Sequence, residues 1–253
     1  MSVRSQFGIA RPQAEGRVVR VSAPSVDSSW GMKMLPSALS MIAGSADAIG
    51  FLGLGGLFIA HITGNLILIA AHILSGTAVS PLHLLSVPLF IAVLGLTRLL
   101  VAGLEAEGLA SLRPLLLLQL LLLAGFLAFG VTAGPSVSPN KVITILAGVL
   151  GVSAMAVQNA MVVSLKDSPS TAVMTTNITR FMMDVGEVLV GKDPDKVAEA
   201  SRRARHTYPA IIGFAVGAGL GAACFAVAGV WSLMLPTTLA LLALAISLAA
   251  QER

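Results

Sequence analysis

The stretch DAIGFLGLGGLFIAHITGN, residues 47–65, decides the fold, because its polar positions return 112 residues later. The second copy, residues 159–177, reads NAMVVSLKDSPSTAVMTTN. Polar residues that match at both ends of an apolar segment predict an internal repeat, and hence two homologous halves. The matched pairs are Asp47 and Asn159, Thr63 and Thr175, and Asn65 and Asn177.

The composition around this stretch is that of a membrane protein. Of the 253 residues, 56% are hydrophobic and only 11% are charged, against roughly 25% charged residues in soluble domains. We therefore expect an all-α, polytopic transmembrane helix bundle whose partner is the lipid bilayer. The net charge of +4 comes from a few loop residues, which indicates membrane orientation and not nucleic-acid binding.

The chain divides into a tail and two repeats of a single membrane domain. Residues 1–34 are expected to be a disordered cytoplasmic tail, since no apolar signal-peptide core precedes the first long hydrophobic run. Repeat 1 covers residues 35–133 and repeat 2 covers residues 142–250. In each repeat the first long span is rich in small and polar residues, as in a lining helix, whereas the third is bland and suits a lipid-facing scaffold. The expected long spans are 35–58, 82–103, 114–131, 142–165, one beginning at Tyr208 and 232–250, with shorter segments at 60–75 and 172–190.

The number of membrane crossings depends on the two shorter segments. If they do not cross, six spans result and the halves have opposite orientations; if they cross, eight spans result and the halves are parallel. Arg180, Asp184 and Glu187 lie on one face of the second segment, and each would cost a few kcal/mol at the bilayer centre, which favours about six full spans plus two short or half helices. The positive-inside rule places the tail and the charged loop 191–206 in the cytoplasm in either case.

Three glycines in the span that begins at Tyr208 recur every four residues. Gly213, Gly217 and Gly221 therefore share one helix face. Such a face lets two helix backbones approach closely, so we predict that it packs against another helix.

Three stretches carry a family resemblance: GSADAIGFLGLGGLFIAHITGN at residues 44–65, VQNAMVVSL at 157–165 and TAVMTTNIT at 171–179. Together they resemble the YoaK-like family of bacterial integral membrane proteins, a domain of unknown function. The resemblance covers roughly residues 36–250 and implies a multi-pass protein of the bacterial inner membrane. We expect both termini to lie in the cytoplasm. It implies no particular activity.

Asp47 is the first candidate functional residue. It falls near the middle of the first span, where an ionised carboxylate is costly unless it is paired, hydrated or protonated. A carboxylate that can change protonation would serve proton or sodium coupling. The alternative is a structural hydrogen bond between helices, for which the amide of Asn159 at the repeated position is an argument.

Uncharged polar residues form a second candidate site. Hydroxyls, amides and exposed backbone groups at broken helices can bind a small ion or solute. Thr and Asn are also good helix N-caps, which is the structural alternative. A histidine seven residues after Asn65, His72, could join a proton relay. The binding candidates beside Asp47 are His61, Thr63, Asn65, Asn159, Thr175 and Asn177.

Charged residues of the second short segment form a third candidate. Arg180 could face an anionic substrate or pair with Asp184 as part of a gate. The alternative is an ion-pair face of one helix that is wetted by the cytoplasm, worth a few tenths of a kcal/mol.

Signatures of enzymes, cofactors and metals are not found. The sequence holds no GxGxxG, GxxxxGK[ST], HExxH or CxxC, and its four histidines, at 61, 72, 83 and 206, lack metal-ligand spacing. We therefore expect no enzyme, no cofactor and no metal site, and favour a secondary transporter or facilitator of a small solute, with proton or sodium coupling. A channel and a non-transporting scaffold or sensor are the alternatives, and a homo-oligomer is left open.

Overall fold

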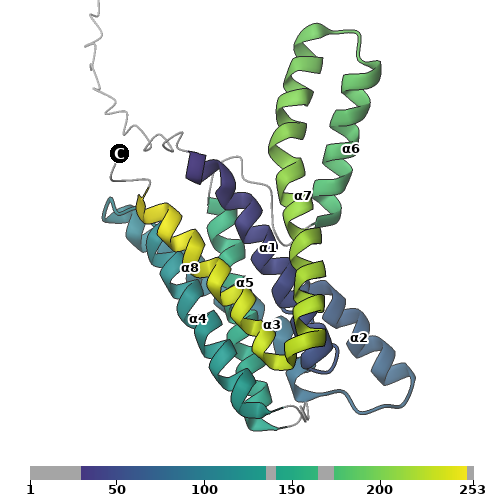
Figure 1. Ribbon diagram of the computed structural model, residues 1–253, viewed down its shortest axis with the longest axis vertical. Helices are drawn as coiled ribbons and strands as arrows, with labels where there is room; N and C mark the ends of the chain where they lie inside the picture. Colours follow the sequence, from purple (N-terminus) through teal and green to yellow (C-terminus); the bar gives the residue numbers. More distant parts are fainter. Residues whose placement is uncertain (1–29, 135–140, 165–173, 250–253) are drawn as a thin grey trace, which may run out of the picture.

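A computed structural model of the protein describes residues 30–134, 141–164 and 174–249, and these residues form an all-α structure (Figure 1). Most of the predicted tail, residues 1–29, and the predicted turn KDSPST, residues 166–171, lie outside the described residues. The helices are α1 (Trp30–Gly53), α2 (Ile62–Leu74), α3 (Pro81–Ala106), α4 (Leu112–Ala133), α5 (Val142–Ser164), α6 (Met174–Val190), α7 (Pro194–Ala228), the 3-10 helix η1 (Gly229–Leu233) and α8 (Met234–Ala249).

The apolar helices make this an integral membrane protein. Five segments of the described chain are long and apolar enough to cross a bilayer. The last of them, Pro194–Ala249, holds both α7 and α8, and the chain reverses between them at η1 (Figure 1). Helices α2 and α6, of 13 and 17 residues, lie at the two predicted shorter segments, and the other helices lie at the predicted long spans, although α8 itself has only 16 residues.

Burial follows the expected division for the first helix of each half but not for α4, which was expected to face lipid and is 33% buried over its most apolar stretch. In the most apolar 18-residue stretch of each helix, 61% is buried in α1 and 67% in α5, whereas only 17% is buried in α3. The first long helix of each half therefore lies inside the bundle, as predicted for a lining helix.

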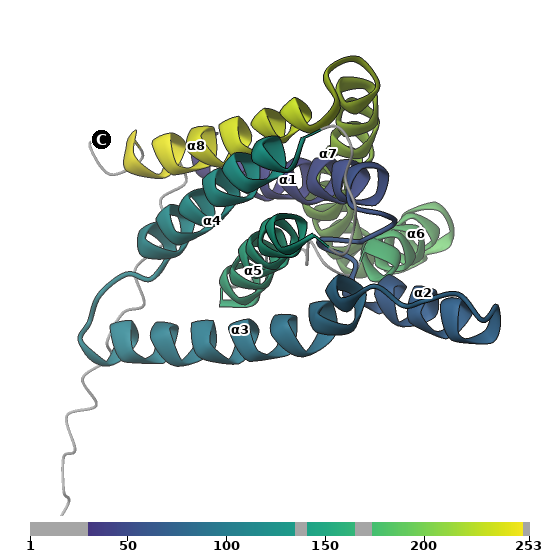
Figure 2. The same cartoon turned by 90° about the horizontal axis from the view of Figure 1, so that it is seen from below.

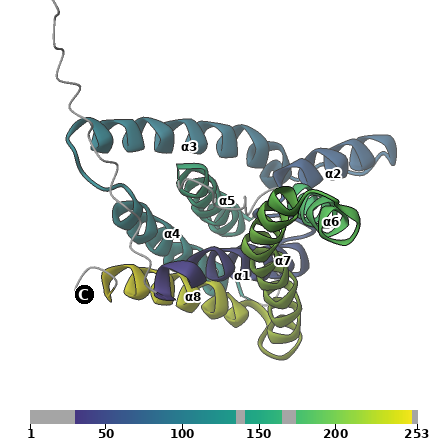
Figure 3. The same ribbon diagram turned by 90° about the horizontal axis from the view of Figure 1, so that it is seen from above.

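The helices pack around α1 and α5 (Figures 2 and 3). Helix α1 lies against α7 and α8, and α5 lies against α3 and α4. The short helix α2 contacts α3, and the short helix α6 contacts α7. Helix α4 also contacts α8. The start of α1 and the end of α8 lie side by side at one end of the bundle, and the α6–α7 hairpin projects toward that end (Figure 1).

The glycine face of α7 packs against the backbone of α1. A Cβ on Gly213 would lie 2.6 Å from the Ser37 carbonyl oxygen, and one on Gly221 would lie 2.8 Å from that of Ser45. A Cβ on Gly217 would collide with the carbonyl oxygen of Met41. The predicted close-packing face is therefore confirmed, and its partner is α1.

Helix α1 ends earlier than the sequence indicated. The expected span continued to Phe58, whereas the helix stops at Gly53. Gly55 and Gly56 take φ angles of 69° and 88°, which L side chains rarely adopt, so the chain turns away from the helix axis there. The residues that follow, 54–61, form a loop inside the bundle.

The charged region 191–206 is mostly helix, so its prediction as a loop was wrong. Helix α7 begins at Pro194, where a missing N–H costs nothing. The Asp193 side chain accepts a hydrogen bond from the Asp195 N–H at 3.1 Å and caps the helix. The charged residues of this region therefore lie on a solvated face of a helix and not in a loop.

Replacing Gly217 by Ala should lower the free energy of unfolding by about 1–3 kcal/mol, because the new methyl group meets rigid backbone of α1. Gly219→Ala is the matched control, since nothing lies within 4 Å of its Cβ position, and it should be neutral or stabilise by up to about 1 kcal/mol. Unfolding by SDS in mixed micelles, followed by circular dichroism, measures both variants. Equal stability of the two would contradict the packing described.

Candidate functional site

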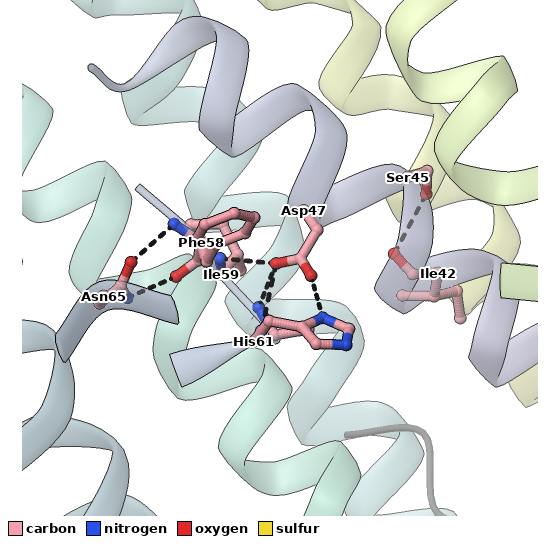
Figure 4. A network of polar contacts seen from close by, with 8 residues as sticks. Ile42, Ser45, Asp47, Phe58, Ile59, His61 and Asn65 are labelled. Atoms are coloured by element: carbon pink, nitrogen blue, oxygen red, sulfur yellow. Dashed lines mark hydrogen bonds and ion pairs between the residues drawn. The ribbon is translucent and has the colours of Figure 1, made fainter. Parts of the chain in front are cut away.

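Asp47, near the end of α1, holds the loop that leads into α2 (Figure 4). Its Oδ1 accepts hydrogen bonds from the backbone N–H groups of Ile59 at 2.8 Å, Ala60 at 2.6 Å and His61 at 3.3 Å. Its Oδ2 is bonded to Nδ1 of the His61 ring. The carboxylate is 5% exposed, so three backbone donors and one imidazole replace the water that an ionised group needs.

Asn65, in the first turn of α2, holds the same loop from the other side (Figure 4). Its Oδ1 accepts from the Phe58 N–H at 2.9 Å, and its Nδ2 donates to the Phe58 carbonyl at 2.8 Å. The same Nδ2 donates to Oγ of Ser86 in α3 at 3.2 Å. The buried amide thus joins the loop, α2 and α3.

The start of α2 is capped differently from the local N-cap that the sequence suggested. His61 occupies the cap position without a side-chain cap bond, and Thr63 and Asn65 lie within the first turn. The acceptor near this positive helix end is the Asp47 carboxylate, from α1. A carboxylate of the chain itself thus lies just before the start of α2 and is already bonded to the loop N–H groups.

His61 extends this network toward α7. Its ring packs edge-on against Phe214, with 5.1 Å between the ring centroids. Asp47 and His61 therefore connect α1, the loop and α7. Of the predicted binding residues, the structure brings Asp47, His61 and Asn65 together in one network.

The second half buries its matching amides. Asn159 in α5 is 8% exposed and Asn177 in α6 is 2% exposed. Unlike these amides, the matching threonines Thr63 and Thr175 are both exposed. The two Asn residues are therefore the better candidates for a site inside the second half.

Asp184 of α6 is paired with α7 and not with Arg180. Nε and Nη2 of Arg203 lie 2.9 and 2.7 Å from Asp184 Oδ1, and Nη1 of the same arginine lies 2.9 Å from Glu199 Oε1. Asp184 is buried whereas Arg180 is exposed. The ion pair that the sequence suggested within α6 is thus replaced by one between α6 and α7, because Asp184 faces the neighbouring helix.

A polar groove of about 850 Å³ lies on this hairpin. Its lining carries more positive than negative groups and includes the buried Asn177. An apolar groove between the same two helices is lined by Phe181, Leu189 and Tyr208 among others. Neither groove is lined by Asp47, His61 or Asn65. The ionisable residues of the polar groove are Arg180, Asp184, Glu199, Arg202, Arg203 and His206.

Two features of the bundle were not predicted: a pair of hydrogen bonds made by glutamines and a pair of neighbouring histidines. Gln119 in α4 donates to Gln158 in α5 at 2.6 Å, and Gln158 donates to the Leu39 carbonyl of α1 at 3.0 Å. His72 and His83 lie next to each other, with 5.9 Å between their ring centroids. A single amide in the leucine-rich run that becomes α4 was the available signal for the first contact. No local spacing indicates the second.

Replacing Asp47 by Ala should lower the free energy of unfolding by about 3 kcal/mol or more, because it leaves several buried N–H groups without an acceptor. Ser40→Ala is the control on the same helix: this buried hydroxyl has no hydrogen-bond partner among the described residues, so its loss should be neutral or stabilising. SDS unfolding of the purified protein measures both. An Asp47→Ala protein as stable as Ser40→Ala would show that the carboxylate does not hold the loop.

Comparison with known proteins gives a family and no activity. The family described as "protein of unknown function (DUF1275)" matches residues 35–246, which is most of the chain and fits the resemblance to the YoaK-like family. No curated protein and no solved structure matches the chain.

Proposed function

Since this chain belongs to the DUF1275 family, whose description assigns no activity, we propose from its own architecture that it is a secondary transporter or facilitator of a small solute. The proposal rests above all on polar residues that are buried at matching places in two similar halves. In it, residues 35–133 and 142–250 are duplicated repeats with opposite orientations in the membrane.

Helix packing supports the duplication. Exchanging α1, α2, α3 and α4 for α5, α6, α7 and α8 turns each major contact into another: α1–α7 becomes α5–α3, α4–α5 becomes α8–α1, and α2–α3 becomes α6–α7. In the proposal three helices of each half cross the membrane, so the second half runs in the opposite direction to the first. Inverted repeats of this kind, with short helices beside the central ones, are a common plan of secondary transporters.

Buried polar side chains support a solute pathway along the central helices. Asp47 and Asn159 lie on α1 and α5, and Asn65 and Asn177 lie in the first turns of α2 and α6. All four are at most 8% exposed. Polar groups at membrane depth are costly and tend to mark substrate or ion pathways. The polar groove beside Asn177 supplies an entrance in this proposal.

Asp47 links protonation to structure in the same proposal. Its carboxylate accepts three backbone hydrogen bonds from residues 59–61, and each is stronger when the group is ionised. A proton taken up from the solution would weaken these bonds and loosen the loop beside Phe214 of α7. Proton movement and loop movement would then be coupled, which is what proton-driven transport requires.

One observation favours a non-transporting scaffold or sensor as the second candidate. Asp47 and Asn65 already have protein partners, so a purely structural role accounts for their hydrogen bonds. In that case Asn177 and the polar groove serve no solute, and no flux depends on them.

Uptake into proteoliposomes distinguishes these functions. Vesicles that contain the protein and the pH dye pyranine are offered amino acids, sugars, carboxylates and inorganic ions in turn, with and without a pH gradient. We expect saturable uptake with counterflow for one class, a fall of about 10-fold in Asn177→Ala, and loss of its pH-driven part in Asp47→Asn. Thr132→Ala, an exposed residue at the end of α4, is the control and should transport normally.

Each other outcome has a definite meaning. Flux that does not saturate and shows no counterflow indicates a channel. Folded protein that moves none of these classes indicates a scaffold or sensor. Undiminished pH-driven uptake by Asp47→Asn removes that residue from the coupling step and leaves it a structural role.

A further inference from the structure

Two histidines from neighbouring helices face each other between α2 and α3. His72 lies in the last turns of α2 and His83 in the first turn of α3. Their ring centroids are 5.9 Å apart and their planes are inclined by 44°. Ten residues separate them in sequence, and the turn between the helices brings them together.

His83 is buried with both ring nitrogens unused. The residue is 2% exposed, and neither Nδ1 nor Nε2 has a hydrogen-bond partner among the described residues. The backbone of Gly56 lies within reach of the ring. A buried polar group without a partner costs on the order of 1–3 kcal/mol, so it calls for a reason. A bound ion or a ligand would supply one.

His72 is held in the form that a metal ligand requires. Its Nδ1 lies 2.7 Å from the carbonyl oxygen of Leu68. A carbonyl only accepts, so Nδ1 carries a proton, and in the neutral ring the lone pair is then on Nε2. Metal-binding histidines usually donate their other N–H to a carbonyl or carboxylate in this way, which fixes the ring and raises its basicity.

The separation of the two rings suits a shared metal ion. Metal–nitrogen bonds of about 2.0–2.1 Å, with half a ring on either side, place the centroids of a His–metal–His unit roughly 5–6.5 Å apart. The observed 5.9 Å lies within that range.

The backbone carbonyls of both histidines accept hydrogen bonds from neighbouring side chains. Oγ of Ser75 and Oγ1 of Thr77 donate to the His72 carbonyl at 3.2 and 3.3 Å. Ser86 donates to the His83 carbonyl at 2.7 Å and is itself bonded by Asn65. The network that holds the loop therefore also positions the first turn of α3.

We propose that His72 and His83 bind a divalent first-row transition-metal ion, with Zn²⁺ as the reference case. Imidazole nitrogens suit Zn²⁺, Cu²⁺ and Ni²⁺ but not Mg²⁺ or Ca²⁺, which prefer oxygen ligands. No cluster of three or more His, Cys, Asp and Glu side chains occurs in the described residues, so the protein supplies two ligands here. With two protein ligands, the remaining coordination positions of the ion are left to water or to a small ligand. This site does not depend on the proposed transport.

Titration of the full-length, tag-free protein in detergent with Zn²⁺, measured by calorimetry, tests the site. We expect about one Zn²⁺ per chain, and a loss of affinity of at least about 10-fold in both His72→Ala and His83→Ala. His206→Ala, which removes a histidine of the polar groove, is the matched control and should bind normally. Co²⁺ provides a second readout, because its visible absorption changes when imidazole binds.

A folding defect would not hide the answer. His72 is only partly buried, so His72→Ala should keep the fold even if His83→Ala does not. In the wild type Zn²⁺ should raise the thermal unfolding temperature, and in folded His72→Ala it should not. Zn²⁺ binding that survives in His72→Ala, or wild-type protein that binds no Zn²⁺, would overturn the proposal.

Discussion

A single buried carboxylate organises the interior of the first half. Within a bilayer an irregular loop has no water to satisfy its backbone, so each N–H group needs an acceptor from the protein. Asp47 accepts from three consecutive residues of the loop 54–61, and Asn65 closes the same loop through Phe58. Without these acceptors the chain could not leave α1 at Gly53 and begin α2 a short distance away inside the bundle.

Sequence reasoning found the important residues but not their partners. The repeat skeleton and the cost of buried charge singled out Asp47 and Asn65. The rule for N-caps is local, however, whereas the acceptor near the start of α2 comes from α1, 14 residues earlier. The helical segments were predictable because an apolar run of about 20 residues has the length of a helix that spans a bilayer. The helix boundaries were less predictable: the glycine turn at Gly55 ends α1 early, and the Asp193 cap starts α7 within the charged region.

Contacts between helices were the least predictable part of the site. His72 and His83 meet only because α2 and α3 turn back on each other. Asp184 pairs with Arg203 across a hairpin and not with the arginine one turn before it. The glycine face of α7 was visible from its spacing, but nothing in that spacing named α1 as its partner. Periodicity reports which face of a helix is special, and tertiary packing decides what that face meets.

Pro209 gives α7 a place to bend. Proline has no N–H, so the carbonyl four residues earlier, that of Arg205, loses its helical hydrogen bond. Oγ of Ser37 in α1 donates to the Pro209 carbonyl at 3.0 Å and fastens the helix just there. Beyond this point α7 is clamped by glycine contacts, and before it the helix carries the charged hairpin. The hairpin is therefore joined to the bundle through a turn of α7 that lacks one helical hydrogen bond, whereas the part of α7 after Pro209 is held against α1.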